Sequence, residues 1–337
     1  YGRRKLLIIA LFGTVATLTL CAFGVSSVSL ITLLLGRFLG GLMAGNMTLA
    51  YASLADFSSP EEKVRNFALI PLATGFGFAC GPYVAGVLAN PDTGYLAGPA
   101  LPFFVAALFS LLNVLLVIWK FPETLTRAIQ KSTIKNYFSG FSKLSKVFQR
   151  APVRPYLWVL FLMISSNFLF VQFVGPFAIE KFHISVTEVG YLYATIGIAV
   201  ALGHLFLTRG LAAYLSSEIA LLWSLLFLAA FLIALLFAPN IVTLHCGSFL
   251  VMLACAVGYT NSMILVSNQA PKEQQGEIMG VAVSIQSLSE FLPAVLIGCI
   301  TGLSENLSFL AAALCAMVSY LILYPLTKKV SHSQREQ

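Results

Sequence analysis

Ten long apolar runs constrain the fold of this chain more than any other feature. Each run has about 20 residues, the length at which a helix crosses about 30 Å of hydrocarbon. The runs lie near residues 6-25, 30-52, 66-88, 100-119, 156-177, 189-208, 219-238, 242-266, 278-300 and 308-326. Of the 337 residues, 58% are hydrophobic and 10% are charged, against about 25% charged in globular proteins. We therefore expect an all-α polytopic membrane protein.

The positions of the basic residues predict the orientation of these spans. The net charge is +7, and 18 of the 20 Lys and Arg residues fall on one side of the predicted spans. Lys181 falls on the other side, and Arg37 lies within a span. Basic residues collect on the cytoplasmic side of membrane proteins. We expect both chain ends in the cytoplasm, in the inner (cytoplasmic) membrane, and the charge requires no nucleic-acid partner.

A polar stretch divides the chain into two parts. We predict four spans in 1-119, a cytoplasmic linker over 120-155, and a six-helix half over 156-337. The linker suits either a helix on the membrane surface or a solvated tether. Because the chain opens inside the basic run YGRRK rather than at a Met, we expect that its natural N-terminus is missing.

One basic and one acidic side chain lie deep within predicted spans. Arg37 follows the second span's start, and an intramembrane Arg is a functional candidate by default; the alternative is that it reaches the outer headgroups or pins a neighbouring helix. Glu290 lies near the middle of the ninth span, where desolvation favours a neutral carboxyl that takes and releases a proton. Gln286 lies one turn earlier on the same face. The alternative for Glu290 is a neutral side chain that bonds a neighbouring helix.

Other polar residues within spans leave two interpretations open. Asn46, Asn167, Gln172 and Asn261 either line a polar pathway or form hydrogen bonds between helices. For His204 and His245, near opposite span ends, interfacial roles are favoured. The six cysteines include no C-x-x-C pair, so we expect neither a metal nor a cofactor.

Glycines spaced four apart mark faces where helices approach closely. Such pairs include Gly36 with Gly40 and Gly77 with Gly81, and packing by itself explains this spacing. Pro82 removes a backbone hydrogen bond in the third span and permits a kink.

Three segments resemble motifs of the major facilitator superfamily, in the family's order. Gly77-x-x-x-Gly81-Pro82-x-x-Ala85-Gly86 resembles the fifth-helix motif of its antiporters, with Ala in place of one late Gly. Leu33-x-x-x-Arg37-x-x-Gly40-Gly41 resembles the fourth-helix motif, whose Arg is associated with proton coupling. Gly2-Arg3-Arg4-Lys5 resembles the end of the loop G-x-L-A-D-x-x-G-R-R.

The resemblance implies the major facilitator fold with ten of twelve helices present, namely helices three to twelve. In this family an acidic residue at the position of Asp56 contacts the loop arginines, and this contact is associated with holding the transporter in its inward-closed state. Arg3 and Arg4 are the corresponding partners here, although the loop's own Asp is absent. The alternative for Asp56 is an ordinary charge at the cytoplasmic rim.

The chain as a whole is most similar to the twelve-helix drug/proton antiporters, which include tetracycline and bicyclomycin or chloramphenicol exporters. This similarity implies alternating access, with protons and an amphiphilic small molecule as partners in the lipid bilayer, and we expect a monomer. Uptake of a nutrient or siderophore by the same fold and an inactive truncated remnant are the alternatives. A membrane-embedded enzyme is disfavoured, because the spans lack clustered His, Asp or Ser-His pairs.

Overall fold

The computed structural model describes residues 2–46, 49–50, 53–54, 69–91, 98–123, 152–269, 275–298 and 306–333, and every regular element among them is helical. Seven of the helices in these ranges are long and apolar enough to cross a membrane, and three shorter ones are also apolar. The expectation of an all-α polytopic membrane protein is therefore confirmed, while the count of ten spans stays a prediction. The chain divides into two compact units.

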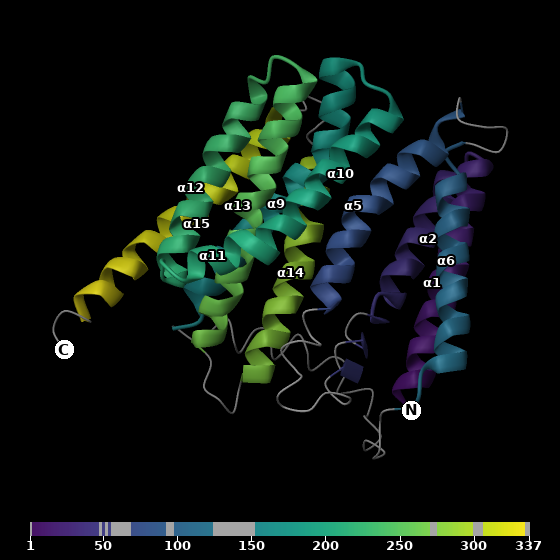
Figure 1. The fold of residues 1–337 in the computed structure, drawn as a ribbon, viewed down its shortest axis with the longest axis horizontal. Coiled ribbons are helices and arrows are strands. Elements are labelled where there is room, and N and C mark those ends of the chain that lie inside the picture. Colours follow the sequence, from purple (N-terminus) through teal and green to yellow (C-terminus); the bar gives the residue numbers. More distant parts are fainter. Residues whose placement is uncertain are drawn as a thin grey trace. The chain divides into compact units, whose positions relative to one another are not determined.

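The first unit comprises Tyr1–Ser132 together with Val186–Tyr191. Its helices are α1 (Arg3–Ser26), α2 (Leu30–Met43), α5 (Leu69–Ala89) and α6 (Leu101–Lys120). Helix α1 packs against both α2 and α6, as the purple and blue ribbons of Figure 1 show. A small cluster of Leu7, Leu11, Val114 and Val117 is buried between α1 and α6.

A tight turn joins α1 to α2 and sets them antiparallel. Val28 adopts a left-handed backbone with φ of 53°, which is uncommon for a β-branched residue. Ser29 then caps α2, because its Oγ accepts a hydrogen bond of 3.4 Å from the Thr32 N–H. The predicted span 30-52 is interrupted, since α2 ends at Met43 before a turn at Ala44 and Gly45.

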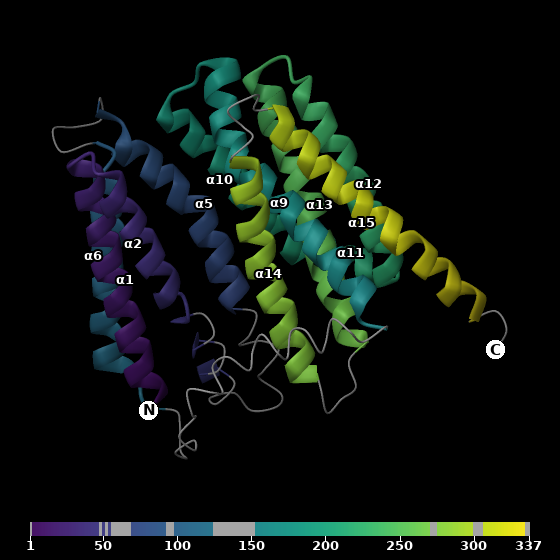
Figure 2. The ribbon, with the colours of Figure 1, turned by 180° about the vertical axis from the view of Figure 1, so that it is seen from behind.

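The second unit comprises Thr133–Ser185 and Leu192–Gln337. Its helices are α9 (Arg154–Phe182), α10 (Val186–Leu202) from Leu192 onward, α11 (Thr208–Ala212), α12 (Ser217–Leu236), α13 (Ile241–Asn268), α14 (Gln275–Gly298) and α15 (Asn306–Ser333). Helix α9 packs against α13, α14 and α15, and α12 packs against α13 and α15 (Figure 2). Helix α9 therefore forms the centre of this unit.

A π-helical turn, η2 (Gly203–Leu207), interrupts the long helix that runs from α10 into α11. It packs against α13. Single π-helical turns within α-helices are rare and frequently lie at functional sites.

Aromatic packing and small residues hold the second unit together. Phe309 of α15 is fully buried, and its ring centroid lies 4.6 Å from that of Phe177 and 5.9 Å from that of Phe170, both on α9. The buried Ser319 hydroxyl donates to the Val159 carbonyl at 3.1 Å. In lipid, helices associate through such close packing and interhelical hydrogen bonds rather than through a hydrophobic driving force.

Candidate functional site

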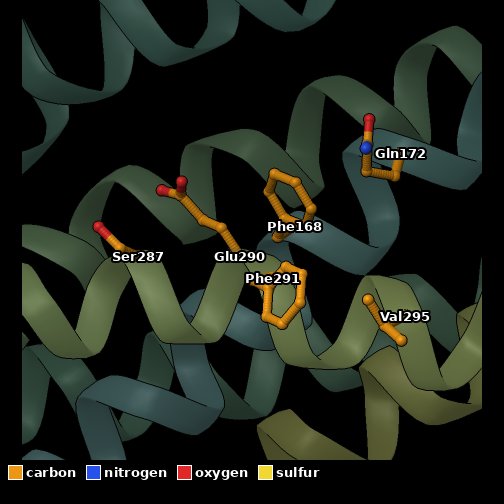
Figure 3. Close-up of a pocket in the computed structure, with 6 residues that line it drawn as sticks. All are labelled: Phe168, Gln172, Ser287, Glu290, Phe291 and Val295. Carbon is orange, nitrogen blue, oxygen red and sulfur yellow. The ribbon is translucent and has the colours of Figure 1, made fainter. Parts of the chain in front are cut away.

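A groove of about 500 Å³ lies within the second unit, between α9 and α14. Its lining residues are Phe168, Gln172, Ser287, Glu290, Phe291 and Val295. Figure 3 shows Glu290 toward one end of the groove and Gln172 and Val295 toward the other. The half-buried Glu290 supplies the only carboxyl of this lining.

Helical spacing explains why these side chains share a groove. On α14, Glu290 and Phe291 lie three and four residues after Ser287, so each is a neighbour of Ser287 on the helix surface. On α9, Phe168 and Gln172 are four residues apart. The two stripes face each other because α9 packs against α14. The result is an apolar, aromatic groove that contains one ionisable group.

A chain of hydrogen bonds connects Glu290 to the neighbouring helix α13. The Gln286 amide nitrogen, Nε2, donates to Glu290 Oε1 at 3.1 Å. The hydroxyl of Tyr259 on α13 donates in turn to Gln286 Oε1 at 3.1 Å. Gln286 therefore has one end of its amide on the carboxyl and the other on the phenol.

His204 stands at the far side of Tyr259, in the π-helical turn η2. The two rings meet edge to face, with centroids 6.4 Å apart and an interplanar angle of 84°. His204 Nδ1 lies 3.2 Å from Thr260 Oγ1. Sequence reasoning favoured an interfacial role for His204 and did not single out Tyr259. The structure places both side chains, half-buried, at the contact of η2 with α13.

Arg37 belongs to the other unit. It is exposed on α2, and its guanidinium carbon lies 5.4 Å from the centre of the Phe103 ring on α6. This distance is within the range of cation–π attraction. The preceding residue, Gly36, is buried against Cys21 and Thr17 of α1. Helix α2 therefore uses its glycine face for packing and presents Arg37 on a different face.

The glycines of the predicted fifth-helix motif differ in their surroundings. Around Gly77 and Gly81, no described atom beyond the adjacent residues and the nearby backbone of α5 itself lies within 4 Å of the position that a Cβ would take. At Gly86, a Cβ would stand 3.0 Å from the Val186 carbonyl oxygen, within the same unit. Pro82 lies inside helix α5, as predicted from the sequence. Close packing within the unit therefore explains Gly86 but not the other two.

The basic segment at the start of α1 meets the end of α6. The Arg3 backbone N–H donates to Glu123 Oε1 at 2.7 Å, and the Arg4 guanidinium donates to the Ile118 carbonyl. Sequence reasoning did not identify Glu123 as a partner. Asp56, the predicted latch partner, lies outside the described residues, as does most of the predicted linker.

The four polar candidates have different environments. Gln172 lines the groove, whereas the buried Asn261 donates to the Val257 carbonyl of its own helix at 2.9 Å. Asn167 Oδ1 is buried, and no described donor reaches it. Asn46 is half-buried, just after the end of α2.

Comparison with known proteins decides the family. A sequence model described as "Major Facilitator Superfamily" matches residues 1–294 of the chain. The chain belongs to the Major Facilitator Superfamily. Major facilitator proteins are transporters, so at the level of the family the chain is a multi-pass membrane transporter, and this supports a non-enzymatic function.

Relatives and solved structures agree with this assignment. The chain is 24% identical to "Tetracycline resistance protein, class C" from Escherichia coli, over 99% of the chain and 82% of the relative. It is 23% identical to "Major facilitator superfamily domain-containing protein 10" from Mus musculus, over 99% of the chain and 75% of the relative. The crystal structure of the human organic anion transporter MFSD10 (TETRAN) superposes with a TM-score of 0.65 at 21% identity, over 96% of the chain and 77% of that structure. The predicted major facilitator fold is confirmed.

Proposed function

We propose that this transporter exports an amphiphilic, drug-like small molecule in exchange for protons, by alternating access. The observation that carries the proposal is the half-buried Glu290 carboxyl within an aromatic groove. An ionisable group in a membrane span is costly and marks an ion or substrate pathway. The relative named as a tetracycline resistance protein supports export of a drug-like compound.

The chemistry of the groove suits both partners of such an exchange. The Phe168 and Phe291 rings offer apolar surface to the body of an amphiphilic molecule. The Glu290 carboxyl offers a site that is neutral when protonated and charged when it is not. When the site faces the side with more protons the carboxyl is protonated, and when it faces the other side it releases the proton. Substrate release is coupled to the protonation cycle of Glu290 if the substrate and the proton compete for the groove.

Further roles follow from the sequence motifs and belong to the same proposal. Arg37 is the coupling candidate of the first unit, and α5 with Pro82 is the helix that moves. Arg3, Arg4 and Asp56 form a cytoplasmic latch, and the segment 120-155 links two halves. Both chain ends are cytoplasmic, in the cytoplasmic membrane of the cell, and the protein is a monomer.

Proteoliposomes with an internal pH-sensitive dye test the proposal, with tetracycline as the probe. We expect tetracycline addition to drive proton movement in the wild type and not in Glu290→Gln. Glu290→Gln should still exchange labelled for unlabelled tetracycline, because that exchange needs no net proton transfer. Glu180→Gln makes the same chemical change on an exposed residue near the end of α9 and should behave as the wild type.

Two outcomes contradict the proposal in different ways. If Glu290→Gln keeps wild-type proton movement, the carboxyl has no part in coupling. If the wild type moves protons inward together with the probe rather than against it, the protein is an uptake system, which was the first alternative from the sequence.

Transport of organic anions is a second candidate. It is supported by the likeness to the human organic anion transporter and by the exposed Arg37 guanidinium, which suits an anionic group. Fluorescein is a suitable probe. Transport of fluorescein but not of tetracycline, lost in Arg37→Ala and retained in Glu290→Gln, would favour this candidate over the first.

A further inference from the structure

The hydrogen bonds around Gln286 have a direction that depends on the charge of Glu290. An ionised carboxylate accepts hydrogen bonds and cannot donate one. In the observed arrangement the Gln286 Nε2 group donates to Glu290, so Gln286 Oε1 is free to accept from the Tyr259 hydroxyl. The amide orientation, the phenol orientation and an ionised Glu290 are therefore mutually consistent.

Protonation of Glu290 changes what the carboxyl requires. The neutral acid has an O–H donor. The hydrogen bond that it accepts from the Gln286 amide is weaker than the bond to the ionised carboxylate, because it is no longer charge-assisted. Gln286 Oε1 is the nearby acceptor that a half-turn of the amide brings to the carboxyl. That half-turn places Nε2, which only donates, opposite the Tyr259 oxygen. Tyr259 must then accept, and its hydroxyl hydrogen must turn to another direction.

We propose that Gln286 is an amide switch that reports the protonation of Glu290 on α14 to Tyr259 on α13. The proposal rests on the proposed function in one respect, namely that Glu290 takes up and releases a proton. Tyr259 and Gln286 are positioning residues, because they act through the Glu290 carboxyl. Apart from the O–H bond that forms and breaks when Glu290 takes up and releases its proton, only hydrogen bonds are made or broken.

The receiving end of the switch lies at the π-helical turn. Tyr259 contacts the His204 ring edge to face, and the next residue, Thr260, lies 3.2 Å from His204 Nδ1. The Thr260 hydroxyl also donates to the Ala256 carbonyl at 3.1 Å, so its oxygen accepts from a His204 that has its proton on Nδ1. A change at Tyr259 is thus passed to the contact between η2 and α13.

The helices that pack against α14 also contain other titratable groups. On α9 they are Arg154, Tyr156, Glu180 and Lys181, which are near its two ends. On α13 they are His245, Cys246 and Cys255, in addition to Tyr259. Among these described groups, Tyr259 is the one that donates to Gln286, which in turn donates to Glu290.

Ultraviolet resonance Raman spectroscopy tests the switch directly, because the tyrosine ring doublet depends on whether the phenol donates or accepts. The difference between the wild type and Tyr259→Phe isolates the Tyr259 signal, and Tyr214→Phe, at an exposed tyrosine, is the matched control. We expect the Tyr259 signal to change from donor to acceptor as pH falls from about 9 to about 4, a range that covers ordinary and buried carboxyls. Glu290→Gln and Gln286→Met should each abolish this change, whereas Glu180→Gln should preserve it.

A Tyr259 signal that is independent of pH in the wild type overturns the proposal, as does an unaltered change in Glu290→Gln. The transport assay separates this failure from failure of the proposed function. If transport is proton-coupled but the Tyr259 signal does not change with pH, the switch is excluded and the proposed function stands. A pH-dependent Tyr259 signal in a protein that moves neither tetracycline nor protons supports the switch and removes the proposed exchange.

Discussion

Replacement of Gly36 by Ala tests the close packing of α2 against α1. A Cβ at this position would lie 2.6 Å from Cys21 Sγ and 3.1 Å from both the Cys21 nitrogen and the Thr17 carbonyl oxygen of α1. Two of these three atoms belong to the backbone, so α1 itself must shift. Gly40, one turn later on the same helix, is the matched control, because its nearest contact would be Thr17 Oγ1 at 3.5 Å.

The expected magnitude follows from two opposing terms. Overpacking of a close contact costs about 1 to 3 kcal/mol, while Gly→Ala within a helix contributes about 0.8 to 1 kcal/mol of stability. Gly40→Ala should therefore be neutral or slightly stabilising. The helical term is common to both variants, so Gly36→Ala should be less stable than Gly40→Ala by about 1 to 3 kcal/mol.

Two measurements check this difference. The first is the free energy of unfolding of each variant in detergent. The second is the rate of maleimide labelling of Cys21, which is 2% exposed in the structure, in a chain whose other cysteines are replaced by Ser. Labelling should be faster in Gly36→Ala and unchanged in Gly40→Ala. Equal stability of the two variants, with Cys21 protected in both, would refute the close contact of α1 with α2.

Three further predictions concern other parts of the molecule. Phe309→Ala removes a fully buried ring from the centre of the second unit and should lower its free energy of unfolding by about 3 to 5 kcal/mol, whereas Phe309→Leu should cost less; equal losses would contradict the aromatic packing. Asn240 Oδ1 caps α13 by accepting from the Thr243 N–H at 2.9 Å, so Asn240→Ala should cost about 1 kcal/mol and Asn240→Asp little, as measured by chemical denaturation. Pro82→Ala restores a backbone donor within α5 and should reduce the transport rate without lowering the unfolding temperature; an unchanged rate in proteoliposomes would exclude α5 as the moving helix.

Much of the fold was predictable because it depends on local patterns. Apolar runs of span length and the glycine and proline motifs indicated a polytopic helical membrane protein of the major facilitator type. The pairing of Gln286 with Glu290 was also accessible, since residues four apart on a helix are neighbours. The break of α2 after Met43 was not predicted, because the apolar run in the sequence continues past this residue.

Contacts between helices could not be read from the sequence. Tyr259 meets Gln286 across 27 residues of chain, His204 meets Thr260 across 56, and Arg3 meets Glu123 across 120. Periodicity defines the apolar face of a helix, but these helices are apolar on nearly every side. Their rotation about their own axes is therefore decided by side-chain packing between helices. The sequence by itself determined that the chain is a multi-pass membrane protein and predicted that the Glu290 carboxyl lies within a span; the tertiary structure decided that this carboxyl is connected through Gln286 to the Tyr259 phenol, and which imidazole that phenol contacts.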